Sequence, residues 1–319
     1  MTLSNKELKS IISGAIRFDE TEDGYLHPQQ YTKDQIDYFK SANTFWYERS
    51  TASNAKTMEI KTDADSVSFE YKIIWIGSPD SVELAVDGSL TEILYVKDLP
   101  KEGTISFTLP KGQKLVTVYL PVDATMVVRN FTIDGVWHIQ DKRERILWLG
   151  DSITQGYGPL RSAQSYVSVA NRILGCSVVN QGIGSYVYDK NAITPIPGYN
   201  PDKIVVAMGT NQHSVDSRKT IEEYYDMLAT VYGSTPVLCI TPIWRGDIPN
   251  TFNMLLKIRE DIEAVCKGYP NITVVDGFKL VPHLNEYFID KLHPNALGCE
   301  IYGRNLALEM IRLGFVDKK

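Results

Sequence analysis

The spacing of apolar residues changes once along this chain, and that change limits the folds that it can adopt. Between about residues 57 and 134, apolar and polar residues alternate in short runs such as SVSFEYKIIWI and KLVTVYLP, separated by Asp-Gly and Pro-Lys-Gly turns. A period of two indicates strands with one buried face. Many short strands of this kind are typical of an antiparallel sandwich. We expect an all-β jelly-roll domain over residues 1–140.

From about residue 144, apolar runs alternate with segments of helical length. Strands are predicted at 145–149, 177–180, 203–208, 236–241 and 272–276, and helices at about 163–174, 217–232, 251–267 and 296–313. Continuous apolar strands separated by helices indicate a parallel sheet covered on both faces. The expected fold class is α/β, with a flavodoxin-like three-layer domain and a five-stranded parallel sheet over residues 141–319. A short linker is expected near residues 137–145.

Composition excludes several classes of partner. The chain has 319 residues and a net charge of −6, so bulk electrostatics gives it no attraction to nucleic acid or to an anionic membrane. No stretch approaches the length of a membrane span, and the first residues lack the apolar core of a secretory signal. The four cysteines form no CxxC pair, which favours reduced, buried thiols. We expect a cytoplasmic protein; the sequence does not indicate its oligomeric state.

Four polar segments follow predicted strands or precede the last helix. They are GDSITQG (150–156), NQGIGS (180–185), GTN (209–211) and DKLHP (290–294). The carboxyl ends of parallel strands meet at one edge of such a sheet, where ligands bind. We therefore expect the four segments to meet at one cleft, although Ser152 and His293 are far apart in the sequence.

The residue types in these segments suit acyl transfer, which needs a nucleophile, a base and donors for the oxyanion. Ser152 supplies a hydroxyl at the start of a predicted helix. His293 can take its proton, and Asp290 can hold the imidazole in one tautomer. The side-chain amide of Asn211 can donate to the oxyanion. A backbone N–H near Gly184 and Ser185 is the expected third donor.

The four segments, in this order, resemble the SGNH, or GDSL, hydrolase superfamily over about residues 144–315. The resemblance implies a catalytic triad of Ser152, His293 and Asp290. It also implies an oxyanion hole made of the backbone N–H of Ser152, a backbone N–H of the second segment and the side chain of Asn211. No cofactor is expected. A metal site is not expected either, since the chain has no HExxH motif and no Cys/His cluster.

Two positions depart from the family pattern. Ser185 stands where the family usually has glycine, and a glycine often marks a φ angle that is costly for other residues. The local geometry of this oxyanion donor is therefore in question. Gln212 stands where an acidic residue is common, at a position that shapes the loop without taking part in catalysis.

The N-terminal half has a second resemblance, in the order and patterning of segments such as YTKDQIDYF (31–39) and VTVYLP (116–121). It is similar to the jelly-roll domain that precedes the catalytic domain in carbohydrate esterase family 2 and in SsfX3-type acyltransferases. This similarity implies a carbohydrate or small-molecule ester as substrate. The aromatic residues at 45–47 and Trp75 are more typical of a core than of a sugar-binding surface.

Several residues of the expected cleft have a structural alternative. A serine in the position of Ser152 commonly caps a helix, and Asp151 is more typical of a residue that orders the turn than of a catalytic one. Asp151 and Gln212 are also candidates for the substrate pocket, and His213 either lines the pocket or faces solvent. Trp244 and Arg245, after the fourth strand, form either a wall beside a sugar or acyl group or a pair that closes a loop.

The sequence favours a serine esterase that hydrolyses O-acyl esters, with O-acetyl esters of carbohydrates as the expected substrates. An acyltransferase would use the same acyl-enzyme with an alcohol as acceptor in place of water. A carbohydrate-binding protein whose hydrolase half has lost its activity is a third possibility, less favoured because Ser152, Asn211, Asp290 and His293 are all present.

Overall fold

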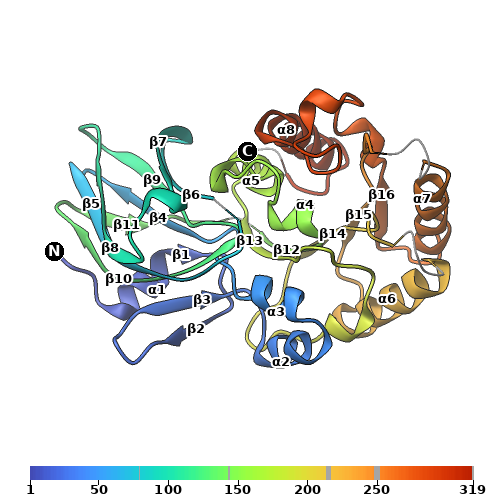
Figure 1. The fold of residues 1–319 in the computed structure, drawn as a ribbon, viewed down its shortest axis with the longest axis horizontal. Coiled ribbons are helices and arrows are strands. Elements are labelled where there is room, and N and C mark those ends of the chain that lie inside the picture. The colour runs from blue at the N-terminus through green and yellow to red at the C-terminus, as the bar shows by residue number, and fades with distance from the viewer. Residues whose placement is uncertain (79, 143, 213–216, 248–251, 318–319) are drawn as a thin grey trace.

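The computed structural model describes residues 1–78, 80–142, 144–212, 217–247 and 252–317. Figure 1 shows two regions side by side, with the antiparallel strands in one and the parallel sheet with its long helices in the other. We call them the N-terminal β region (residues 1–139) and the C-terminal α/β region (residues 145–317). A division into domains at residues 140 and 141 remains a prediction.

Eight strands of the N-terminal β region form a jelly roll. They are β3 (Leu26–Gln29), β4 (Thr57–Thr62), β5 (Ser66–Ile76), β6 (Ser81–Val86), β7 (Ser89–Tyr95), β8 (Glu102–Thr108), β9 (Lys114–Tyr119) and β10 (Ala124–Ile133). One sheet has the order β4-β9-β6-β7 and the other β3-β10-β5-β8, with antiparallel pairing throughout. This strand order joins two Greek keys, as in a jelly roll, and confirms the predicted fold.

Alternation of side chains produces the core between these two sheets. In β5, Val67, Phe69 and Tyr71 are buried, while the residues between them are partly exposed. They share one apolar cluster with residues of the facing sheet, among them Met58 and Val118. Each sheet thus buries one face against the other.

Three short strands extend the sheets. β1 (Ile12–Ser13) and β11 (Trp137–Ile139) both pair with β4, and β2 (Arg17–Glu20) pairs with β3. The prediction that the linker begins near residue 137 is wrong for its first three residues, because Trp137 pairs with Thr62 and packs against the core.

The C-terminal α/β region has the predicted parallel sheet. Its strands are β12 (Arg145–Gly150), β13 (Ser177–Gly182), β14 (Lys203–Ala207), β15 (Val237–Ile240) and β16 (Ile272–Val275), in the order β13-β12-β14-β15-β16. This is the flavodoxin-like order, which confirms the fold class. In such a sheet the switch point, where ligands bind, lies between β12 and β14.

Helices cover both faces of the parallel sheet. They are α4 (Ser152–Gln155), α5 (Tyr166–Leu174), α6 (Ser217–Tyr232), α7 (Phe252–Cys266) and α8 (Ala296–Arg312). Within β12, Ile146 and Trp148 pack with α5 and α8, whereas Leu147 and Leu149 pack with α6 and α7. Short 3-10 helices occupy 96–98, 162–164, 190–192, 277–279 and 285–287.

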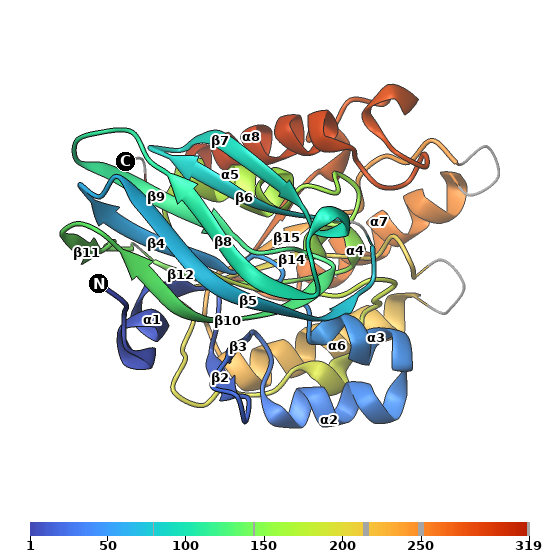
Figure 2. The same cartoon turned by 60° about the vertical axis from the view of Figure 1, so that its left-hand side comes forward.

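The N-terminal β region also has three helices: α1 (Asn5–Ile11) precedes the jelly roll, whereas α2 (Lys33–Ala42) and α3 (Thr44–Ser50) lie between its strands β3 and β4. Thr32 and Gln35 form a capping box at the start of α2, and the side chain of Asn43 caps α3. Figures 1 and 2 show α2 and α3 outside the sandwich and beside the C-terminal α/β region. Phe39 and Trp46 bring these helices against Tyr186, with ring centroids 6.0 and 5.0 Å away.

The N-terminal β region also binds the outer strand of the parallel sheet, β13. Asn54 Nδ2 donates a hydrogen bond to the carbonyl of Asn180, at 3.3 Å. Gln181 Nε2 donates to the carbonyl of Gln30, at 2.7 Å. The second motif, which begins in β13 and continues past its end, is therefore held between the two regions.

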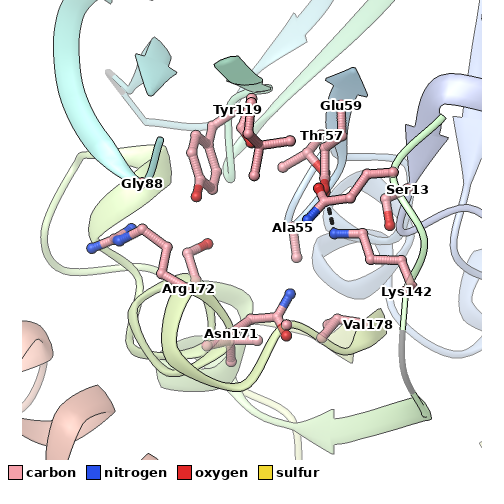
Figure 3. A pocket seen from close by; sticks show the side chains of 16 residues that line it. Ser13, Ala55, Thr57, Glu59, Gly88, Tyr119, Lys142, Asn171, Arg172 and Val178 are labelled. Atoms are coloured by element: carbon pink, nitrogen blue, oxygen red, sulfur yellow. Dashed lines mark hydrogen bonds and ion pairs between the residues drawn. The ribbon is translucent and has the colours of Figure 1, made fainter. Parts of the chain in front are cut away.

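The two regions enclose a small polar cavity of about 100 Å³ between β4, β9 and α5. In Figure 3, Tyr119 and Arg172 lie at one side of this cavity, and the ion pair between Glu59 and Lys142 lies at the other. None of the residues that line it belongs to the four motifs. It is therefore separate from the candidate active site.

The remaining sequence expectations concern cysteines and membrane spans. Cys176, Cys239, Cys266 and Cys299 are buried and form no disulfide. In the described part of the chain, no helix combines the length and the apolar composition that crossing a membrane requires.

Candidate active site

Ser152 is the first residue of α4, and its neighbour Asp151 caps this helix. The backbone of Asp151 is extended, and its carboxylate accepts a hydrogen bond from the N–H of Ile153 at 3.0 Å. The strand can meet the helix this closely because residue 150 is glycine: a Cβ there would lie 2.1 Å from Thr154 Oγ1. The capping role that a serine here could fill therefore belongs to Asp151, and the hydroxyl of Ser152 is left for other partners.

Ser152, His293 and Asp290 form a continuous chain of hydrogen bonds. Ser152 Oγ lies 2.8 Å from His293 Nε2, and His293 Nδ1 lies 2.7 Å from Asp290 Oδ2. The other carboxylate oxygen accepts from the backbone N–H of His293, at 2.7 Å, and of Leu292, at 3.0 Å. Burial raises the pKa of Asp290, but the hydrogen bonds from His293 and Leu292 outweigh it and hold the pKa below its usual value. Asp290 is thus a carboxylate that can stabilise an imidazolium.

Tyr157 and Gly158 hold the imidazole from another side. The ring of Tyr157 meets that of His293 edge to face, with centroids 4.7 Å apart. A Cβ on Gly158, whose φ is +127°, would lie 2.3 Å from the carbonyl oxygen of Pro294. Neither residue has a role that the sequence predicts. Both directly follow the first motif, but an aromatic residue there gives no indication of which ring it contacts.

The three predicted oxyanion donors belong to residues that line one cavity with the triad. The N–H of Ser152, at the first turn of α4, has no acceptor within the helix. Ser185 has a φ of +59°, the left-handed conformation that the family's usual glycine suggested. Its N–H has no acceptor among the described residues. Asn211 Nδ2 donates one hydrogen to the carbonyl of Tyr186, at 3.0 Å, and its second hydrogen has no acceptor among the described residues.

Gly184 was the other backbone candidate, and its N–H is already engaged. It donates to Gln155 Oε1 at 2.8 Å. Of the two N–H groups that the sequence analysis considered in the second motif, only that of Ser185 remains for an oxyanion.

These residues line a cavity of about 290 Å³ to which both regions contribute. The lining residues are Phe45, Arg49, Ser78, Ser152, Gln155, Tyr157, Gly184, Ser185, Asn211, Asp290, Leu292 and His293. The guanidinium of Arg49 lies 3.4 Å from the ring centroid of Phe45. Phe45 is 41% exposed, so the expectation that it belongs to the core is wrong. Its exposure follows from its position on α3, at the edge of the cleft.

Asp151 and Gln212 do not line this cavity. Burial of Asp151 raises the pKa of its carboxyl to about 7. Gln212 is buried, and its Oε1 accepts from the N–H of Tyr188 at 2.9 Å, so it shapes the loop after the third motif. His213 lies outside the described residues.

Trp244 and Arg245 also lie away from the cavity lining. Trp244 stacks on His283, with ring centroids 5.6 Å apart. Arg245 pairs with Asp247 at 2.6 Å and donates to the carbonyl of Thr210 at 3.0 Å. These contacts match the alternative in which both residues close their loop.

Comparison with protein families supports the reading of the four motifs. Residues 148–301 match the GDSL-like Lipase/Acylhydrolase family, and this range contains all four. Residues 148–301 therefore form a GDSL-like lipase/acylhydrolase domain. Among curated proteins, no match to this GDSL-like chain is found.

Solved structures share the whole two-region architecture of this GDSL-like protein. The salicylyl-acyltransferase SsfX3 from a tetracycline biosynthetic pathway has a TM-score of 0.78 at 17% identity, over 97% of this chain and 96% of its own. A putative GDSL-like lipase from Bacteroides ovatus has a TM-score of 0.74 at 14% identity, over 100% and 99%. A family two carbohydrate esterase from Clostridium thermocellum, in complex with cellohexaose, has a TM-score of 0.64 at 18% identity, over 83% and 94%. At these identities the likeness shows a common fold.

Proposed function

We propose that this GDSL-like protein is a serine esterase that hydrolyses O-acyl esters, with O-acetyl esters of carbohydrates as its substrates. The observation that carries the proposal is the unbroken chain from Ser152 Oγ through His293 to Asp290, with links of 2.8 and 2.7 Å. The hydroxyl at the end of this chain opens into the cavity shared by the two regions.

In the proposed mechanism, Ser152 Oγ attacks the ester carbonyl while its proton passes to His293 Nε2. Asp290 stabilises the imidazolium that forms. The negative charge on the carbonyl oxygen is met by the N–H groups of Ser152 and Ser185 and by Asn211 Nδ2. Removal of one such donor lowers kcat by about 10²–10³-fold in enzymes of this type. His293 then protonates the departing alcohol, and a water activated by His293 releases the acid.

The cleft walls support a substrate that carries many oxygen atoms. Arg49 and Ser78, from the N-terminal β region, and Asn211 all line the cavity with hydrogen-bonding groups. The fold likeness to an esterase solved in complex with cellohexaose also supports a carbohydrate as the alcohol.

The test is acetate release from a panel of acetylated sugars and aryl esters, combined with labelling by a fluorophosphonate probe. The wild type should release acetate and be labelled, and Ser152→Ala should do neither. Ser41→Ala, an exposed serine on α2, is the matched control and should behave like the wild type. Labelling and turnover that persist in Ser152→Ala would overturn the proposal. A wild type that cleaves aryl esters but no acetylated sugar would limit the error to the substrate.

Transfer of the acyl group to an alcohol is a second candidate, supported by the fold likeness to SsfX3 over almost the whole chain. Product analysis with and without sugar or alcohol acceptors separates the two reactions. An acyltransferase would form the transferred ester at low acceptor concentration, whereas an esterase would release free acid. A non-catalytic carbohydrate-binding protein would do neither and would resist the probe.

A further inference from the structure

Gln155, three residues after Ser152, connects the N-terminal β region to residues 183–186, which we call the oxyanion loop. Its side chain is buried, at 1% exposure. Oε1 accepts a hydrogen bond from the N–H of Gly184 at 2.8 Å. Nε2 donates to Asp123 Oδ1 at 3.0 Å and to the carbonyl of Val122 at 3.2 Å. One amide thus joins two residues that directly precede β10 to the N–H of Gly184, the residue before Ser185.

The oxyanion loop needs such support because its conformation sets the direction of one N–H. Tyr186 N donates to the carbonyl of Ile183 at 3.2 Å, so residues 183–186 form a β-turn with Gly184 and Ser185 at its centre. A positive φ at Ser185, with Gly184 absent from the glycines of positive φ, is the φ pattern of a type II turn. In the more common type I turn the peptide between these two residues is turned over, and the N–H of Ser185 would point away from the cleft.

The type II form is not the natural preference of this sequence. A residue other than glycine in the left-handed region costs about 1–2 kcal/mol. Contacts from outside the loop must therefore favour it. Phe45 and Arg49 of α3 press on Gly184 from the other side: a Cβ there would lie 2.9 Å from Phe45 Cε1 and 3.0 Å from Arg49 Cδ. Gly184 is thus fixed between α3 and the amide of Gln155.

Asp123 is in turn held firmly by its own region. It is 1% exposed, its N–H donates to Asp80 Oδ2 at 3.0 Å, and its carbonyl accepts from the N–H of Gly77 at 2.8 Å. The Nε of Arg49 lies 3.7 Å from its Oδ1. Asp123 does not line the catalytic cavity, so any effect that it has on catalysis must pass through other residues.

We propose that Gln155 is a positioning residue through which the N-terminal β region, by way of Asp123, anchors Gly184 and so keeps the turn in the form that aims the Ser185 N–H at the oxyanion. This inference rests on the proposed function and extends it. The N-terminal β region then acts on the chemical step and does more than supply a wall of the cleft.

The first test is kinetic and uses Gln155→Met, which keeps the length of the side chain and removes its hydrogen bonds. Because it weakens one oxyanion donor, kcat on an aryl acetate should fall about 10–100-fold while KM changes less than about threefold. Affinity for a trifluoromethyl ketone, which forms a tetrahedral adduct, should fall by the same factor as kcat/KM. Rates are referred to active sites counted with the fluorophosphonate probe, so partial misfolding does not imitate the effect. A kcat per active site equal to that of the wild type would overturn the inference.

The second test exchanges the partners. Gln155→Glu alone places two carboxylates together and should lower kcat as much as Gln155→Met. Combined with Asp123→Asn, the new carboxylate can accept from both the Gly184 N–H and the new amide, and kcat should return to within about tenfold of the wild type, a coupling that a double-mutant cycle measures. Failure of the pair to recover any activity, with native melting temperature, would contradict a link through these two side chains.

A third measurement does not depend on turnover. Amide hydrogen exchange at Gly184 and Ser185 should be faster in Gln155→Met than in the wild type, because the Gly184 N–H loses its acceptor. If the wild type proves to have no esterase activity while this exchange changes as expected, the proposed function fails and the structural link remains. If the enzyme is active and the exchange is unchanged, the link itself is wrong.

Discussion

The carboxylate of Asp151 accepts a hydrogen bond from Ile153 N, 3.0 Å away, and so caps α4, a role that a serine beside it could also fill. The adjacent serine is thereby relieved of capping, and its Oγ lies 2.8 Å from His293 Nε2. Asp151 thus caps the helix and Ser152 contacts His293, although the sequence alone allowed Ser152 to be the cap. The division has a measurable consequence, because Asp151 is a buried acid.

Asp151→Asn should remove part of the pH dependence of stability. Burial raises the pKa of Asp151 to about 7, so between about pH 4 and 7 the folded state holds a proton that the unfolded state has released. Stability therefore falls as pH rises through this window, by up to about 1.4 kcal/mol for each pKa unit. The asparagine keeps the cap and should flatten this slope in urea unfolding between pH 4.5 and 7.5. Burial raises the pKa of Asp80 to about 7 as well, so Asp80→Asn is the comparison and should flatten the slope similarly. Unchanged slopes in both variants would show that these acids are charged when folded.

Asp290→Asn should lower kcat by about 10³–10⁴-fold, since an amide at this position both loses the charge and favours the wrong tautomer of His293. Single-turnover measurements on an aryl acetate at pH 7.5 would show the loss in acylation. The melting temperature should change little, because Asp290 lies at the cleft with its side chain 44% exposed. Asp247→Asn, at the pair with Arg245, is a control that should retain activity within a few-fold. A loss in Asp290→Asn of less than tenfold would mean that another group orients the imidazole.

Substitutions at Ser185 should separate the chemistry of its side chain from that of its backbone. Ser185→Gly keeps the N–H and accepts the φ of +59° without strain, so kcat should stay within about threefold of the wild type. Ser185→Val keeps the N–H too, but a β-branched residue strongly disfavours a positive φ. We expect the turn to change its form and kcat to fall at least tenfold. Equal activity in the two variants would indicate that the Ser185 N–H does not meet the oxyanion.

Arg49→Met should discriminate between classes of substrate. The unbranched side chain can still pack on Gly184 and Phe45, but it loses the donors that face the cavity. Because a hydrogen bond from a charged donor contributes about 1.5–3 kcal/mol, kcat/KM for an acetylated sugar should fall about 10–100-fold. The fall for a small aryl acetate should be much smaller. Arg218→Met, an exposed arginine on α6, serves as the control. An equal fall in kcat/KM on all esters would show that Arg49 has a structural role and does not contact the sugar.

Local patterns predicted the architecture well because each strand and helix has its own periodicity. The five parallel strands appear within two residues of their expected ends, and seven of the eight jelly-roll strands lie within residues 57–134, where alternating runs predicted short strands. The predicted cluster of Ser152, Asn211, Asp290 and His293 meets at one cavity because the flavodoxin-like order places their loops at one edge of the sheet.

Contacts between distant segments could not be predicted from the sequence. Nothing in the run TFWYERS (44–50) indicates that Phe45 and Arg49 face the cleft, because that depends on how α3 docks on another region. The choice between Gly184 and Ser185 as donor was open for the same reason. It is decided by the side chain of Gln155, whose role depends on a residue of the jelly roll.

The outer strand β13 lies at an edge of the parallel sheet, and the side of it that faces the jelly roll is covered by Asn54 and by the bond from Gln181 to Gln30. An uncovered edge strand is a template for pairing with another chain. A fragment cut to residues 141–319, which would retain every residue of the proposed triad, would present that edge to solvent. We expect such a fragment to aggregate, and its inactivity would then reflect a missing cover over β13 as well as a missing wall of the cleft.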